Sequence, residues 1–219
     1  MLSKPTLDFL KSLKKNNQRD WFNANKSKYE STKKEFEIFI AKLISEISRF
    51  DKIVSGTEAK NCIFRIYRDV RFSHDKSPYK NHFGAFISYK GKNSNGPGYY
   101  IHIEPGNCFL AGGIYHPDGV QLNLIRKEIE FSLKYFKKIL NNKDFVKYFG
   151  GLSDMGKLKT SPKGFPKEHP ALELLQHKSY IVSHSVNDKQ VISDNFFSYS
   201  VNIFRAIRPL NKFLNTAMD

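Results

Sequence analysis

The sequence has little cysteine and no apolar run long enough to cross a membrane. Its two cysteines, Cys62 and Cys108, form no CxxC motif, and nothing suggests a secretory context for the single disulfide they could form. Both stand in apolar, strand-like surroundings, where a free cysteine behaves as a small hydrophobic residue. The N-terminus lacks the apolar core of a signal peptide, and no stretch approaches 18 apolar residues. These absences predict a reduced, cytoplasmic protein without a transmembrane segment.

Several catalytic and metal-binding motifs are also missing. The chain contains no GxxxxGK[ST] phosphate loop, no GxSxG nucleophile motif and no HExxH metalloprotease motif. His74, His82, His102 and His116 do not stand at zinc-type spacing from the cysteines. From these patterns we expect no metal site and no cofactor.

Positive charge and aromatic side chains are present in excess. Lys and Arg number 36 against 21 Asp and Glu, which gives a net charge of +15. Such an excess indicates either an anionic partner (nucleic acid, a membrane surface or a phosphorylated metabolite) or a basic, solvated surface. The lysines are scattered, which argues against a disordered nucleic-acid-binding arm. With 219 residues, 19 Phe and 11 Tyr, the chain is expected to form one domain, 1–219, around a sizeable core.

Apolar periodicity predicts an α+β fold, in which a mainly antiparallel sheet from the central third of the chain is packed by N-terminal and C-terminal helices. Helical spacing covers 27–50, a segment after the candidate N-cap Asp118, and a last segment from about 194, where Pro209 predicts a kink or break near Arg208. Strand-like runs cover 62–72, 83–90, 99–104, 108–115 and 179–186. Short connections rich in Gly, Pro and Asn favour hairpins over βαβ crossovers.

One stretch, 64–80, is the densest in charged, histidine and tyrosine side chains. If 63–72 is a strand, its side chains alternate between a core-facing set and a polar row. The core-facing set is then Phe64, Ile66, Val70 and Phe72, and the polar row is Arg65, Tyr67, Asp69 and Arg71. Arg68 falls on the core-facing side, so it needs either a bulge that turns it outward or an acidic partner.

The charges of this stretch do not balance. Five Lys and Arg face two Asp between Arg65 and Lys80, so local pairing leaves positive charge over. Arginine suits bidentate binding of carboxylate or phosphate, and Lys76 and Lys80 could fold back as a lid. We therefore predict a basic pocket for a small anionic or phosphorylated ligand. Its ligand-binding residues would be Arg65, Tyr67, Arg68, Asp69, Arg71, Lys76, Tyr79 and Lys80.

A second polar row lies on the predicted strand 99–104. Alternation puts Tyr100, His102 and Glu104 on one face of that strand. A histidine near a glutamate is a candidate acid–base pair, so His102 and Glu104 are the candidate catalytic residues if the protein is an enzyme. If both polar rows lie on the same side of one sheet, these groups converge with the arginines.

Four segments form a recognisable set of motifs. They are Asn17-x-Arg19-Asp20-Trp21-Phe22-x-x-Asn25-Lys26, Phe64-Arg65-x-Tyr67-Arg68-Asp69-x-Arg71-Phe72-Ser73-x-Asp75-Lys76-x-Pro78-Tyr79-Lys80, Gly98-Tyr99-Tyr100 and Pro162-Lys163-Gly164-Phe165. Together they resemble the uncharacterised family known as domain of unknown function 2461. The resemblance spans nearly the whole chain and implies a single-domain protein found mainly in bacteria, with 64–80 in the family signature. It implies no particular activity and no catalytic residue.

Three functions remain open from the sequence. The first is binding of a small anionic or phosphorylated ligand at the 65–80 pocket, with or without catalysis. The second is a nucleic-acid-binding module, which the net charge supports although no helix-turn-helix or RRM-type signature occurs. The third is an interaction protein in which the Arg and Asp side chains of 65–80 form a structural ion-pair ladder.

Overall fold

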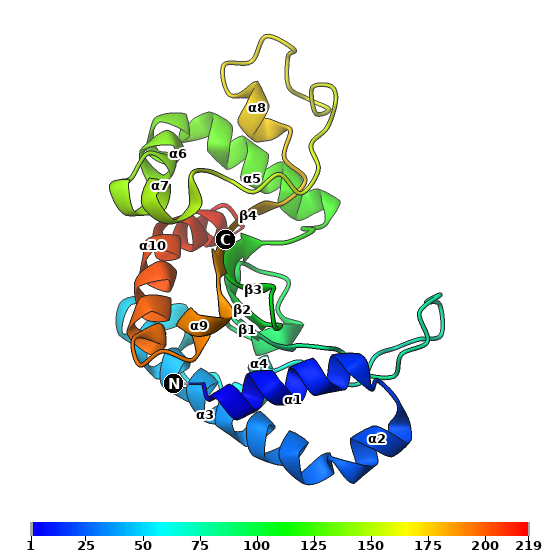
Figure 1. Ribbon diagram of the computed structural model, residues 1–219. Coiled ribbons are helices and arrows are strands. Elements are labelled where there is room, and N and C mark those ends of the chain that lie inside the picture. Colours follow the sequence, from blue (N-terminus) through cyan, green and yellow to red (C-terminus); the bar gives the residue numbers. More distant parts are fainter. Residues whose placement is uncertain (1, 219) are drawn as a thin grey trace.

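A four-stranded antiparallel sheet forms the centre of the fold (Figure 1). The computed structural model describes residues 2–218 of the chain. The strands are β1 (Phe83–Ile87), β2 (Gly98–Ile103), β3 (Cys108–Ile114) and β4 (Tyr180–Val186), and they lie in the sheet in sequence order. The predicted α+β class and the predicted antiparallel hairpins are confirmed.

Helices precede and follow the sheet in the chain. Before it come α1 (Lys4–Lys15), α2 (Arg19–Ala24), α3 (Lys26–Phe50), the 3-10 turn η1 (Lys52–Val54) and α4 (Ala59–Cys62), and a second 3-10 turn, η2 (Gly91–Asn93), lies between β1 and β2. After β3 come α5 (Gly119–Phe131), α6 (Leu133–Leu140), α7 (Lys143–Phe149), α8 (Leu172–Leu175), α9 (Asp188–Val191) and α10 (Phe196–Thr216). Asp118 caps α5 as predicted, because its carboxylate accepts hydrogen bonds from the backbone N–H groups of Val120 and Gln121.

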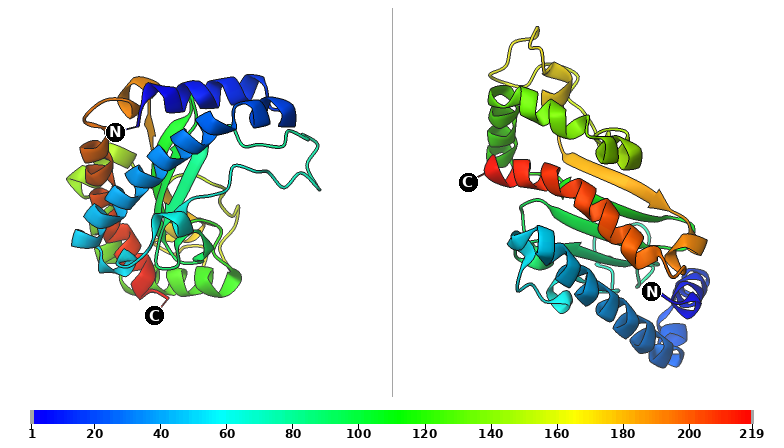
Figure 2. Two further views of the ribbon diagram at one scale, coloured as in Figure 1. Left: turned by 90° about the horizontal axis from the view of Figure 1, so that it is seen from below. Right: turned by 90° about the vertical axis from the view of Figure 1, so that its left-hand side faces the viewer.

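The two long helices α3 and α10 cover one face of the sheet (Figure 2). On the α3 side, the ring of Phe83 on β1 stacks on Phe36, with centroids 5.4 Å apart. On the α10 side, a Cβ added to Gly112 of β3 would lie 2.6 Å from Ile207, so only glycine allows this close approach. Among residues 2–218, no long helix packs on the opposite face in this way, and that face carries the side chains described in the next section.

Helix α10 runs without a break from Phe196 to Thr216, through Pro209. Pro209 was expected to kink or break the helix near Arg208, and no break occurs there. Ile207 and Leu210, on either side of the proline, are both fully buried. Packing of this apolar face holds the helix together across the missing backbone N–H group, and so overrides the local preference of proline.

The strand predicted at 62–72 is wrong. Only Ile63 and Phe64 reach the sheet, through a bridge to Ala85 and a backbone hydrogen bond of 2.9 Å to Gly84. Beyond them, residues 66–80 pair with themselves in an irregular hairpin that projects from the body of the protein (Figure 1). Phe72, expected in the core, is 95% exposed. The predicted alternation fails because this segment pairs with its own return arm and not with the sheet.

The base of the 66–80 hairpin is held by the N-terminal helices. The rings of Tyr79 and Phe22 of α2 stack with centroids 3.9 Å apart. The side chain of Asn17 brackets the backbone of Tyr79, donating to its carbonyl at 2.9 Å and accepting from its N–H at 3.1 Å. These contacts place Lys80, at the end of the return arm, beside the sheet.

Both cysteines are buried free thiols, as the sequence predicts. Among the helices within residues 2–218, none combines the length and apolar character that a membrane crossing requires.

Stability should depend on the base of the hairpin and not on its tip. Phe22→Ala removes a ring that is 2% exposed and should lower the free energy of unfolding by about 3–5 kcal/mol. Phe72→Ala removes an exposed ring and should change it by less than about 0.5 kcal/mol. Urea denaturation of both variants measures this difference, and equal losses would contradict the assignment of the anchor.

Candidate functional site

A cavity of about 580 Å³ lies on the face of the sheet that α3 and α10 leave uncovered. Its floor comes from β1, β2 and β3, and its walls come from the segments that flank the sheet. Aromatic and apolar side chains dominate the lining, among them Phe64, Phe86, Tyr100, Phe109, Tyr115, Met155 and Ile181. The polar side chains that line it are Lys80, His82, Ser94 and Asn95. The site therefore combines an apolar body with a few polar groups, as small-molecule sites do.

The register between β1 and β2 determines the floor of this cavity. Gly84 pairs with His102, and Phe86 pairs with Tyr100, so these residues share the open face. A Cβ on Gly84 would lie 2.9 Å from the hydroxyl oxygen of Tyr100. The missing side chain of Gly84 thus provides the space that the Tyr100 hydroxyl occupies.

Tyr100, His102 and Glu104 form a hydrogen-bonded chain along this face. The Tyr100 hydroxyl lies 2.9 Å from Nδ1 of His102, and Nε2 of His102 lies 3.3 Å from Oε2 of Glu104. Asn107 and Lys14 also donate to the Glu104 carboxylate, at 3.2 and 3.4 Å. The alternation predicted for β2, which brings His102 and Glu104 together, is confirmed.

The protonation state of this chain follows from its partners. Burial raises the pKa of the Glu104 carboxyl, but hydrogen bonds from Asn107, His102 and Lys14 outweigh it and lower the pKa overall. An ionised Glu104 can only accept, so Nε2 of His102 carries its proton and Nδ1 accepts from Tyr100. Burial lowers the pKa of His102, against the raising effect of Glu104, and burial raises the pKa of Tyr100 to about 12. At neutral pH Tyr100 is therefore a phenol, His102 a neutral imidazole and Glu104 a carboxylate.

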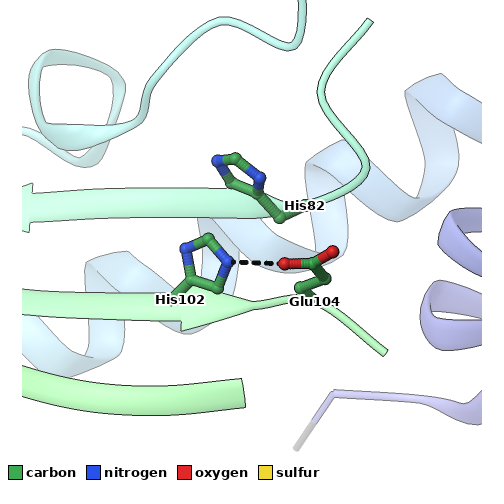
Figure 3. A group of neighbouring side chains, drawn as sticks. All are labelled: His82, His102 and Glu104. Atoms are coloured by element: carbon green, nitrogen blue, oxygen red, sulfur yellow. Dashed lines mark hydrogen bonds and ion pairs between the residues drawn. The ribbon is translucent and has the colours of Figure 1, made fainter. Parts of the chain in front are cut away.

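His82 lies beside this chain, on the segment that leads into β1 (Figure 3). Its ring centroid is 4.2 Å from that of His102, whose other side stacks on Phe109 at 4.7 Å. Burial, together with the neighbouring His102 and Lys80, lowers the pKa of His82 to about 4, against the raising effect of Glu104. His82 lines the cavity, and behind it the His102 imidazole and the Glu104 carboxylate lie close by.

Lys80 is the one residue of the predicted ligand-binding set that lines the cavity. Its ammonium lies 5.4 Å from the centroid of the Phe64 ring. Within residues 2–218 it has no ion-pair partner at 4.0 Å or less. Burial lowers the pKa of Lys80, and the charge of Arg65 lowers it further. A half-buried lysine that lacks a carboxylate is suited to meet an anion from outside.

The other predicted ligand-binding residues lie elsewhere, on the 66–80 hairpin and its base. Arg68 pairs with Asp75, and Arg71 pairs with Asp69 at 2.7 Å. Asp75 is thus the acidic partner that Arg68 was expected to need. The rest of the set is arranged as follows: Lys76 donates to the Val70 carbonyl at 3.0 Å, Tyr79 is buried, and Arg65 and Tyr67 are exposed. The hairpin therefore contains two local ion pairs and does not form a continuous polar row on the sheet.

Sequence reasoning did not assign His82, Phe109 or Gly84 to a site. Alternation within one strand relates residues of that strand only. His82 joins His102 through the pairing of β1 with β2, and the loop of ten residues between those strands does not set that register. Gly84 was the one indication in the sequence. A glycine within a strand indicates that a side chain from a neighbouring strand occupies the space beside it, as Tyr100 does here.

Comparisons with known proteins identify one related family. A family model described as "Conserved hypothetical protein (DUF2461)" matches residues 5–213 of the chain. Comparison with curated proteins found no match, and neither did comparison with solved structures.

The lowered pKa of His82 predicts a loss of stability in acid. Unfolded His82 takes up a proton near pH 6.5, whereas folded His82 does so only near pH 4. Between these values the unfolded state binds more protons, so the free energy of unfolding falls as the pH is lowered from 6.5 to 4. His82→Gln should reduce that fall by at most about 3 kcal/mol.

Chemical denaturation at several pH values measures this slope. The matched control is His74→Gln, because His74 is exposed on the hairpin. An unchanged slope in His82→Gln, or an equal change in His74→Gln, would contradict the burial of a neutral His82.

Proposed function

This chain belongs to the DUF2461 family, whose description carries no activity, and on that premise we propose that it binds a small organic anion in the cavity on the open face of the sheet. The ligand has a flat apolar or aromatic body and a carboxylate or phosphate group. A reducing location such as the cytoplasm is part of this proposal, because Cys62 and Cys108 are both free thiols. The observation that carries the proposal is Lys80 lying unpaired at a cavity of aromatic side chains.

The apolar body of the ligand would lie on the floor of the cavity. Phe86, Tyr100 and Phe109 stand on three neighbouring strands, and their rings face the same space. Aromatic rings stack well on flat apolar groups, with a gain of about 0.5–1.5 kcal/mol per pair beyond the burial of area. A ligand with a ring system therefore suits this floor better than a small inorganic anion.

The anionic group of the ligand would pair with Lys80. Any anion bound there gains a charge-assisted hydrogen bond, worth about 1.5–3 kcal/mol. The Lys80 ammonium is already partly withdrawn from water. A ligand that covers it would strengthen this hydrogen bond further, because charges attract more strongly where water is excluded. The net charge of +15 favours the approach of any such ligand.

The chain of Tyr100, His102 and Glu104 would give the site a capacity for proton transfer. Tyr100 lines the cavity. Its hydroxyl oxygen can accept a proton from the ligand while its own proton passes to Nδ1 of His102. The imidazolium that forms is stabilised by Glu104. The reaction class that suits this arrangement is general acid–base catalysis on the bound anion.

The 66–80 hairpin stays an alternative place for anion binding. Arg71 is mostly exposed, and its guanidinium lies 5.8 Å from the ring of the exposed Phe72. Its pairing with Asp69 already neutralises part of its charge. We therefore favour the cavity, and the same binding experiment can compare the two places.

The proposal predicts which lysine controls ligand affinity. A thermal-shift screen of aromatic carboxylates, nucleoside monophosphates and sugar phosphates should find compounds that raise the melting temperature, because binding to the folded state alone stabilises it. Lys80→Met should weaken the affinity for the best compound about 10- to 100-fold, since one charge-assisted hydrogen bond is lost.

Two further variants complete the experiment. Lys42→Met serves as the matched control, because Lys42 is exposed on the outer side of α3, and should leave the affinity unchanged. Arg71→Met tests the hairpin. A loss of affinity in Arg71→Met but not in Lys80→Met would move the site to the hairpin, and the absence of any stabilising compound would count against small-anion binding altogether.

A further inference from the structure

We propose that His82, His102 and Glu104 bind a divalent transition-metal ion beside the cavity, at the point where His82 lines it (Figure 3). Each residue offers one ligand atom, and these atoms all lie within 4.8 Å of one another. The spacing of histidines and cysteines in the sequence gave no indication of this site. One of its ligands, Glu104, is a carboxylate, and another, His82, comes from a different segment of the chain than His102 and Glu104. The inference does not depend on a ligand occupying the rest of the cavity.

Two of the three ligand atoms already have the spacing that a metal requires. Nε2 of His102 and Oε2 of Glu104 are 3.3 Å apart. In a tetrahedral site with bonds of about 2.0–2.1 Å, ligand atoms are about 3.3–3.4 Å apart. His82 must therefore approach by at most about 1.5 Å. It stands just before β1, outside the hydrogen-bonded ladder, so rotation of its side chain can supply this movement.

The surroundings of His102 and Glu104 resemble the hydrogen-bonding shell around ligands in known metal sites. A metal-bound histidine usually donates its second N–H to a fixed acceptor. Here Nδ1 of His102 faces the Tyr100 hydroxyl at 2.9 Å. The other oxygen of Glu104, Oε1, accepts from Lys14 at 3.4 Å, while Asn107 donates to Oε2 at 3.2 Å. These contacts orient both groups before any metal arrives.

Metal binding at Nε2 requires the other tautomer of His102. The proton of the neutral imidazole then sits on Nδ1 and is donated to the Tyr100 oxygen, so the number of protons on the pair does not change. The Tyr100 O–H is freed to point into the cavity. A metal would thus turn Tyr100 from a donor to histidine into a donor to a bound ligand.

The ligand set indicates the class of metal. Two imidazoles and one carboxylate suit Zn²⁺, Fe²⁺, Mn²⁺ or Co²⁺, and they leave positions open for water or a substrate. Ca²⁺ and Mg²⁺ prefer oxygen ligands and fit poorly. Because His82 lines the cavity, a metal held by it would be accessible to molecules in that cavity.

Isothermal titration of the full chain with Zn²⁺, and separately with Mn²⁺, tests the proposal after removal of metal with a chelator. We expect one equivalent of Zn²⁺ to bind with micromolar or tighter affinity. Glu104→Gln and His82→Ala should each weaken that affinity by about 100-fold or more, and Tyr100→Phe by about 10- to 100-fold with the same stoichiometry.

His74→Ala is the matched control, since His74 is an exposed histidine of the hairpin, and it should bind Zn²⁺ like the unchanged protein. Glu104→Gln preserves size, so its circular dichroism should match, which separates loss of binding from loss of folding. No binding at micromolar Zn²⁺, or binding that survives both Glu104→Gln and His82→Ala, would overturn the site. Stabilisation by organic anions in the metal-free protein tests the small-anion proposal separately.

Discussion

The pairing of β1 with β2 places Gly84 opposite His102, and the candidate site depends on that register. A shift by one residue would turn Tyr100 and His102 toward α3 and α10, into an apolar core. In the observed register Gly84 leaves space for the Tyr100 hydroxyl, and the buried face of the sheet holds the strands in place. The core therefore fixes the register, and the register aligns the phenol, the imidazole and the carboxylate.

The uneven cover of the sheet explains why the site lies where it does. Helices α3 and α10 pack on one face of the sheet (Figure 2). The cavity lies on the other face, where segments that flank the sheet contribute to its lining. The 66–80 hairpin contributes to one wall only at its base, where Lys80 follows the anchored Tyr79. Its tip pairs its charges locally, so the long signature motif and the cavity share only the two ends of the motif, Phe64 and Lys80.

The sequence predicted the parts of the fold that depend on local patterns. Alternation along β2 assigned Tyr100, His102 and Glu104 to one face, and Asp118 was identified as a helix cap. At Pro209 the sequence left a kink or a break open, and tertiary packing keeps the helix unbroken. Prediction failed at 62–72, because aromatic and β-branched residues resemble a strand whether they pair with a sheet or with their own return arm. His82 was missed because its position relative to His102 depends on contacts between strands.

The tautomer of His102 tests the account most directly. Long-range ¹H–¹⁵N correlation spectra of the metal-free protein at pH 7 report which ring nitrogen of each histidine carries a proton. We predict that His102 is neutral, with its proton on Nε2 toward Glu104 and with Nδ1 accepting from Tyr100. A doubly protonated His102, or a proton on Nδ1 in the metal-free protein, would contradict the hydrogen-bonded arrangement of Tyr100, His102 and Glu104.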